Sequence, residues 1–134
     1  MGILIDTNIL IKAEKGTIVL DSYIEKRKDE DFFISVITAS ELLHGVWRAE
    51  DNAIQARRSA FVEAILSSIP VLSIDLPTAR SHAQLWARLQ SDGQMIGVHD
   101  SWIAASCINY GLLLVTDNTR EFERVPGLQI EQWT

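Results

Sequence analysis

The apolar residues of this chain form short uninterrupted runs, which alternate with longer stretches where apolar and polar positions repeat with a helical period. Short apolar runs without polar interruption are typical of strands that are buried on both faces. The predicted strands cover residues 2–5, 32–36, 71–74, 112–115 and 128–130. The predicted helices cover residues 9–13, 18–28, 39–48, 53–67, 78–90 and 101–109, and Gly111 ends the last of them.

This alternation of strands and helices predicts an α/β domain with three layers, in which helices flank a mostly parallel central sheet. A length of 134 residues suits one domain, so we expect residues 1–134 to form a single unit. No internal repeat, low-complexity tract or flexible linker is visible. In such a sheet, ligands bind beyond the carboxyl ends of the strands, and functional side chains are expected there.

Acidic and amide side chains stand at four junctions between predicted strands and helices. Asp6 directly follows the first strand, and Glu41 opens the helix after the second strand. Asp100 begins the last helix, and the pair Asp117 and Asn118 follows the fourth strand. Because the carboxyl ends of parallel strands share one edge of the sheet, these groups are expected to converge.

Each of these groups also has a purely structural interpretation. Asp6 and Asp100 suit helix caps, Thr38 and Glu41 have the spacing of a capping box, and the remaining pair is ordinary turn sequence. Together, however, crowded carboxylates repel each other and raise each other's pKa. A hard divalent cation removes that cost, and Mg²⁺ prefers a few carboxylates plus waters. The convergence therefore favours a metal centre.

At these residues the chain resembles the PIN-domain ribonucleases, most closely the VapC-type toxins of bacterial toxin–antitoxin pairs. The motifs that carry the resemblance are residues 6–8, 35–45, 97–105 and 115–127, which together extend over nearly the whole chain. Each motif is loose by itself. Their order, their spacing and the closing stretch are together specific.

The resemblance implies an endoribonuclease that cleaves single-stranded or structured RNA with Mg²⁺ or Mn²⁺, as the toxin of a type II pair. Asp6, Glu41 and Asp100 match the family's catalytic and metal-binding acidic positions. Asn118 matches a fourth, often acidic, position, so Asn118 and its neighbour Asp117 join the expected metal ligands. Glu121 is an alternative source of that carboxylate, acting through water. An antitoxin that blocks the site and a homodimer are the implied assemblies.

Other polar residues near these positions have narrower expected roles. Thr116 and Asn8 are expected to orient carboxylates, as is Ser40 unless it is only a helix-start hydroxyl. His99 is tempting as an acid or base, but a loop histidine facing solvent or its own backbone is the preferred interpretation. The best candidates for phosphate contacts are two arginines that flank the proposed site, Arg120 and Arg124.

Composition adds boundary conditions to this picture. The formal net charge of −6 argues against broad, non-specific nucleic-acid binding, although acids that hold a metal contribute to it. No apolar run is long enough to span a bilayer, so no membrane association is expected. The single cysteine, Cys107, is expected in the core and fits a reducing, cytoplasmic location. Trp47 and the helix at residues 53–67 are expected to form the antitoxin groove.

Three alternatives were weighed against this hypothesis. A phosphorelay receiver needs a late lysine, and no lysine follows Lys28. A haloacid-dehalogenase-like phosphatase would need an aspartate where Asn8 stands. A catalytically degenerate PIN-like module that only binds RNA or protein stays open, with Asn118 as its only support.

Overall fold

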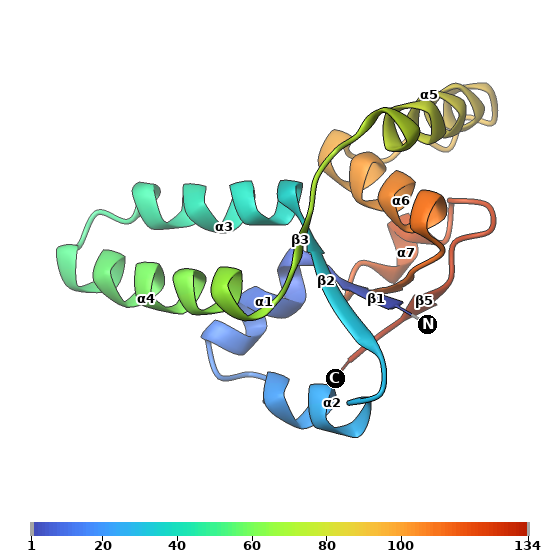
Figure 1. The fold of residues 1–134 in the computed structure, drawn as a ribbon. Helices are drawn as coiled ribbons and strands as arrows, with labels where there is room; N and C mark the ends of the chain where they lie inside the picture. The colour runs from blue at the N-terminus through green and yellow to red at the C-terminus, as the bar shows by residue number, and fades with distance from the viewer. Residues whose placement is uncertain (1, 134) are drawn as a thin grey trace.

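The computed structural model describes residues 2–133, so the first and last residues of the predicted 1–134 domain lie outside it. Five strands form one sheet in the order β3-β2-β1-β4-β5, and every neighbouring pair is parallel (Figure 1). The strands are β1 (Gly2–Ile5), β2 (Asp31–Ser35), β3 (Val71–Leu72), β4 (Leu113–Val115) and β5 (Ile130–Glu131). The predicted α/β class with a parallel sheet is confirmed.

Helices occupy the connections between these strands. They are α1 (Thr7–Glu14), α2 (Leu20–Lys26), α3 (Val36–Arg48), α4 (Asn52–Ser68), α5 (Leu76–Ser91), α6 (Val98–Tyr110) and α7 (Thr119–Phe122). In Figure 1, α3 and α4 form one pair beside the sheet, and α5 and α6 form another. Within residues 2–133, none of these helices combines the length and apolar character that crossing a membrane requires.

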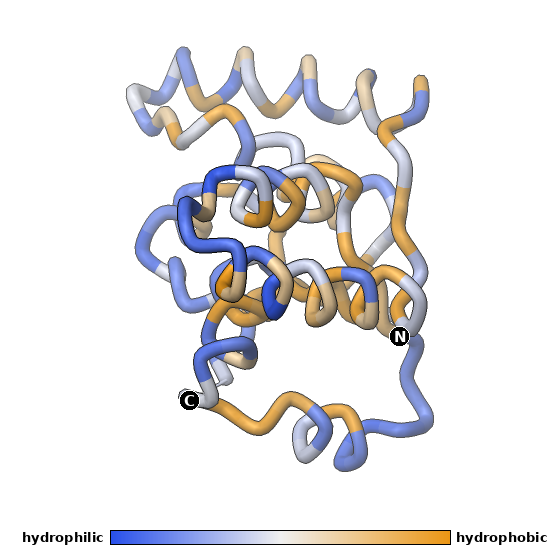
Figure 2. Tube along the Cα trace, turned by 90° about the vertical axis from the view of Figure 1, so that its left-hand side faces the viewer, coloured by the Kyte–Doolittle hydropathy of each residue, from blue (hydrophilic) through white to orange (hydrophobic). Residues whose placement is uncertain are grey.

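The period-two alternation of β1 separates two hydrophobic cores. Ile3 and Ile5 point into the core formed with α1 to α4, whereas Leu4 points into the core formed with α5, α6 and α7. Burial of both faces explains why β1 is an uninterrupted apolar run. The outer helices instead alternate apolar and polar residues around their turns, as Figure 2 shows by colour. Cys107 is buried in the second core, as predicted.

α3 and α6 each begin three residues earlier than predicted, and this changes the interpretation of Glu41 and Asp100. α3 starts at Val36, and its cap is Ser35, whose Oγ accepts a hydrogen bond from the Ile37 N–H at 3.0 Å. Thr38 is fully buried inside that helix, so the suggested capping box with Glu41 is wrong. α6 starts at Val98, which places Asp100 in the first turn rather than at the cap.

The C-terminal end of the chain closes the first core. Trp133 is 3% exposed, and its ring stacks on Tyr23 with centroids 4.7 Å apart. Its indole N–H donates to Glu131 at 2.7 Å, so the polar end of the ring is also satisfied. Trp133 therefore packs in the first core and holds β5 at the sheet edge.

Replacing Trp133 by Ala is expected to lower the free energy of unfolding by about 3–5 kcal/mol, because a large buried ring leaves a cavity. Urea denaturation measures the loss. Gln129→Ala, an exposed change on the same C-terminal segment, should stay within about 0.5 kcal/mol of the parent. A Trp133→Ala protein as stable as the Gln129→Ala control would show that this end is not packed as described.

Candidate active site

The candidate site lies where β1 and β4 end side by side. The Asp6 N–H donates to the Val115 carbonyl at 2.9 Å, so the two strand ends are tied together at the point where acidic residues begin. The chain leaves β1 toward β2 on one side, while β4 lies on the other. This is the switch point of the sheet, where open α/β sheets leave a crevice for ligands.

Asp6 is a buried carboxylate held by a set of short hydrogen bonds. Its Oδ1 accepts from the Thr7 N–H at 2.8 Å, and its Oδ2 accepts from the Thr116 hydroxyl at 2.7 Å. The Asn8 amide donates to the same Oδ2 at 3.2 Å. Thr116 and Asn8 therefore contact this carboxylate as predicted. The group is only 3% exposed, so its orientation is set before any ligand arrives.

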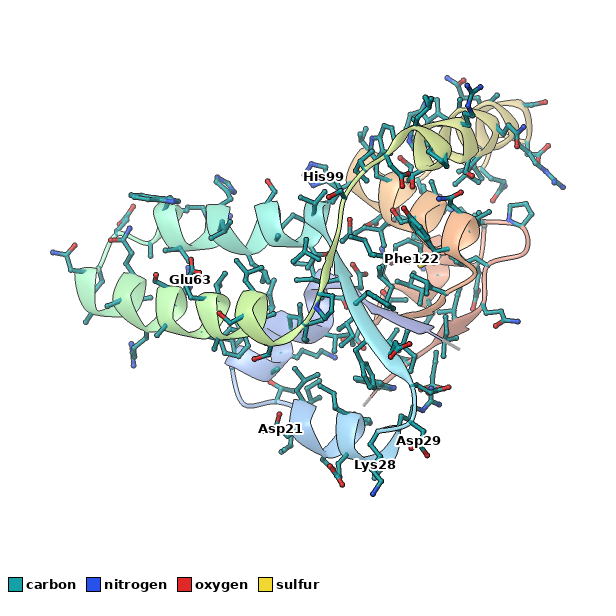
Figure 3. All side chains as sticks on the ribbon, in the orientation of Figure 1. Asp21, Lys28, Asp29, Glu63, His99 and Phe122 are labelled. Carbon is teal, nitrogen blue, oxygen red and sulfur yellow. The ribbon has the colours of Figure 1, made fainter. Side chains whose placement is uncertain are left out.

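Glu41 reaches the site from α3, and the side chain of Thr7 links it to the end of β1. The Thr7 hydroxyl donates to Glu41 Oε1 at 2.8 Å and lies 3.0 Å from the Thr38 hydroxyl. On its other side, Glu41 Oε2 lies 3.5 Å from His99 Nδ1. Figure 3 shows His99 beside the beginning of α3. His99 is largely exposed, as expected, but it faces Glu41 rather than its own backbone.

Asp100 meets Glu121 of α7 and Asn118, the cap of that helix. The Asn118 amide donates to Asp100 Oδ2 at 3.3 Å and to Glu121 Oε2 at 2.6 Å. Glu121 also accepts from the Gly97 N–H and shares a hydrogen bond with Asp100. The sequence predicted Asn118 at this site, but it predicted Glu121 only as an alternative ligand acting through water. The signal available was spacing, because residues three apart on a helix share a face.

The electrostatics show that these acids are close to one another. Burial raises the pKa of Asp6, against the lowering effect of the bonds from Thr116 and the Thr7 N–H, and the charges of Glu41 and Glu121 raise it further. Burial together with the charges of Asp6 and Glu121 raises the pKa of Asp100 to about 7. Glu121 behaves oppositely, because the Gly97 N–H and the Asn118 amide outweigh its burial and lower its pKa. Of the two acids, Asp100 therefore takes up a proton more readily than Glu121.

Two other predicted groups are directed elsewhere. The Asp117 carboxylate forms an ion pair with Lys12 and accepts from Gln132 at 3.4 Å, while its backbone N–H donates to Asn8. It therefore contacts none of the three central acids. Arg124 donates to the Met95 carbonyl at 2.8 Å, which ties α7 to the loop before α6. Of the other candidates, Arg120 and Ser40 are exposed.

His82, which was not predicted as a site residue, stabilises the first turn of α6. His82 on α5 stacks between Trp86 and Trp102, with ring centroids 5.6 Å and 3.6 Å away. Its Nε2 lies 2.8 Å from the hydroxyl of Ser101, a fully buried neighbour of Asp100. Burial also lowers the pKa of His82. The backbone that carries Asp100 is thus fixed through α5.

The donor chemistry at this edge fits a hard divalent cation. Within residues 2–133, no lysine or arginine forms an ion pair with Asp6, Glu41, Asp100 or Glu121. Oxygen ligands with uncompensated charge are what Mg²⁺ takes up. In their present rotamers, however, no three His, Cys, Asp or Glu side chains of the described chain are gathered to hold a metal ion. Glu41 and Glu121 are partly exposed and have room to turn.

Comparison with known proteins places this geometry in a family. A family model described as the PIN domain matches residues 3–128. The chain belongs to the PIN domain family. It is 36% identical to the tRNA(fMet)-specific endonuclease VapC of Shigella flexneri, an alignment that covers 98% of this chain and 97% of that protein. It is 32% identical to the ribonuclease VapC of Rickettsia bellii over 97% of this chain and 95% of that protein.

Solved structures agree with the sequence relatives. The fold matches a chain of the DNA-bound VapBC structure from Salmonella typhimurium with a TM-score of 0.90 and 32% identity, covering 100% of this chain and 99% of that one. PIN-domain membership therefore rests on sequence and on backbone geometry together.

The raised pKa of Asp100 predicts a pH dependence of stability in metal-free protein. Its folded pKa of about 7 exceeds the unfolded value of about 3.9. Between these values the native state binds more protons than the unfolded state, so stability falls as pH rises. From pH 5 to pH 8 in EDTA, the parent is expected to lose about 1–2 kcal/mol more than Asp100→Asn does. This loss is smaller than a fully buried carboxyl group would give, because Asp100 is only half buried and solvent screens its charge.

Urea unfolding at each pH measures this difference. Asp29→Asn is the matched control, since Asp29 is exposed and Figure 3 places it far from His99. The control should follow the parent at both values. Equal pH profiles for the parent and Asp100→Asn would show that this carboxyl group is not crowded by other acids.

Proposed function

We propose that the chain, as a single PIN-like domain, is a magnesium-dependent endoribonuclease and the toxin of a type II toxin–antitoxin pair in the cytoplasm. One observation carries the proposal: the negative charges of Asp6, Glu41, Asp100 and Glu121 act on one another at the switch point, and within residues 2–133 no lysine or arginine forms an ion pair with any of them. The names of the relatives, which are ribonucleases, point in the same direction.

Asp6, Glu41 and Asp100 are the proposed catalytic ligands of Mg²⁺, with Mn²⁺ as an alternative. When bound, the ion would polarise a phosphate oxygen and supply an activated water for phosphodiester hydrolysis. Of the proposed additional ligands, Asn118 and Glu121 touch Asp100, whereas Asp117 is engaged by Lys12. We therefore favour Glu121 as the fourth acid, with Asn118 holding it.

The residues around the acids perform the positioning. Thr116 and Asn8 hold Asp6 in one rotamer, and Thr7 holds Glu41. The Asn118 amide keeps Asp100 and Glu121 together despite their repulsion. Removing a residue that fixes the orientation of a metal ligand typically lowers metal affinity by roughly 10–100-fold. The alternative of a degenerate binding module gains no support, because Asn118 takes part in the acidic cluster.

Asp6→Asn is expected to lower the rate of RNA cleavage by more than about 100-fold, because it removes a proposed ligand of the metal. Glu41→Gln should do the same, since an amide is a poor Mg²⁺ ligand. The assay is cleavage of single-stranded oligoribonucleotides and of tRNA, including initiator tRNA because one relative is named for it. Thermal unfolding with and without Mg²⁺ gives a second readout, in which only the parent should be stabilised.

Glu63→Gln is the matched control for both measurements, because Glu63 is an exposed acid on α4, away from the cluster. It should cleave at the parental rate and keep the Mg²⁺-dependent stabilisation. If Asp6→Asn and Glu41→Gln also cleave at the parental rate in Mg²⁺, the acidic centre is not catalytic.

The proposed partners are an antitoxin protein and a second copy of the chain. The solved relatives are VapBC complexes. Trp47 is 80% exposed on α3 and lines a hollow of about 300 Å³ together with Val46 and Gln55, among other residues. A large exposed ring beside a hollow is a typical docking point. A basic antitoxin side chain placed against Asp6 and Asp100 would take up the charge that the metal otherwise meets.

Expression from the native operon is expected to yield a complex that elutes with the antitoxin, and light scattering should report an even number of toxin chains. Trp47→Ala should weaken capture of the antitoxin by about tenfold or more, as loss of an aromatic anchor does. Leu76→Ala is the control, because Leu76 is an apolar side chain on α5 that is 64% exposed. Recovery of the toxin alone, still toxic beside the upstream protein, would contradict the partner.

A further inference from the structure

A cavity next to the acidic centre has lining residues of a different kind. Its volume is about 290 Å³, and it lies between the end of α1, α3 and α4. Glu41 is part of its lining, so the cavity adjoins one of the proposed metal ligands. Its apolar lining consists of Ile11, which is 38% exposed, and of the nearly buried Leu42 and Val62. A volume near 300 Å³ is large enough for a group of nucleotide size.

The rim of this cavity carries positive charge without a partner. Lys15, Arg48 and Arg58 line it. Arg58 is already used, since its Nε lies 3.5 Å from Glu14 and its Nη1 donates to the Gly45 carbonyl at 3.0 Å. The side chains of Lys15 and Arg48 form no ion pair or hydrogen bond within residues 2–133. Once a metal engages Glu41, these two are the uncompensated charges of the cavity.

We propose that this cavity is a nucleotide subsite for the RNA strand that neighbours the scissile phosphate, with Lys15 and Arg48 contacting its phosphates. The inference rests on the proposed function and adds where the substrate extends. A flexible strand with one phosphate at Asp6 and Glu41 has its next nucleotide beside the cavity. Base and sugar meet the exposed side chain of Ile11, and the two cations meet the backbone. This also shows how a protein of net charge −6 holds RNA, because the positive charge is local.

The test measures RNA affinity as a function of salt. The probe is a labelled single-stranded oligoribonucleotide, and binding is read by fluorescence anisotropy in a cleavage-blocked Asp6→Asn background between 50 and 200 mM KCl. Each phosphate contact to a single strand contributes about 0.7 to the slope of log affinity against log salt. The double change Lys15→Gln with Arg48→Gln should therefore reduce that slope by about 1.4 and weaken binding about tenfold at the lower salt.

The matched control is Lys28→Gln with Arg80→Gln. Lys28 and Arg80 are also exposed and lie outside the cavity, so this double removes the same charge elsewhere. It should keep the parental slope. In the cleavage-competent background, the first double should raise KM for the RNA about tenfold and leave kcat within about twofold, because it removes binding shared by ground and transition states.

Three results would overturn the subsite. Equal losses in both doubles would show that only net charge matters. Unchanged RNA binding with weaker antitoxin capture in the first double would assign the cavity to the protein partner. Parental RNA cleavage with an unchanged salt slope would reject the subsite while leaving the proposed function intact. A parent that binds no RNA would contradict the proposed function itself.

Discussion

Electrostatic repulsion among carboxylates at the ends of β1 and β4 is the constraint around which this molecule is arranged. Asp6 is buried there with its charge opposed by Glu41 and Glu121, and burial is itself unfavourable for the charged form. The fold supplies three donors to Asp6 rather than a cation. Such donors fix the carboxylate without neutralising it. The negative charge at this site is therefore not neutralised by the hydrogen bonds, and a metal ion or a basic side chain of a partner would neutralise it.

The convergence of the site could be predicted because parallel topology converts sequence position into spatial position. Asp6 follows a strand that is apolar on both faces, so its location at a sheet edge follows from the strand itself. Asp100 lies in the first turn of α6 and, with Glu41, is close enough to Asp6 for their charges to interact. A mostly parallel sheet flanked by helices was likewise implied by uninterrupted apolar runs alternating with helices, and the sheet is parallel at every neighbouring pair.

Side-chain direction was harder to predict, because spacing along the chain does not show which tertiary partner is nearer. Thr38 and Glu41 have the spacing of a capping box, yet Ser35 caps the helix and frees Glu41 to meet Thr7. Asp117 follows the same strand as Asn118, but Lys12 draws it away. His82 is distant in sequence from Asp100 and reaches its helix only through the packing of α5 on α6.

Asn118 is the position where this chain departs from an all-acidic centre, and its contacts give that departure a physical reason. A carboxylate at this position would add a further negative charge next to Asp100 and Glu121. The amide instead donates to both, at 3.3 Å and 2.6 Å. The neighbouring carboxylate is that of Glu121, about one helical turn further along the chain on α7, and it also accepts a hydrogen bond from the Gly97 N–H. The number of acids near Asp100 is thus preserved while their mutual repulsion is reduced, so an amide here is compatible with a working metal centre.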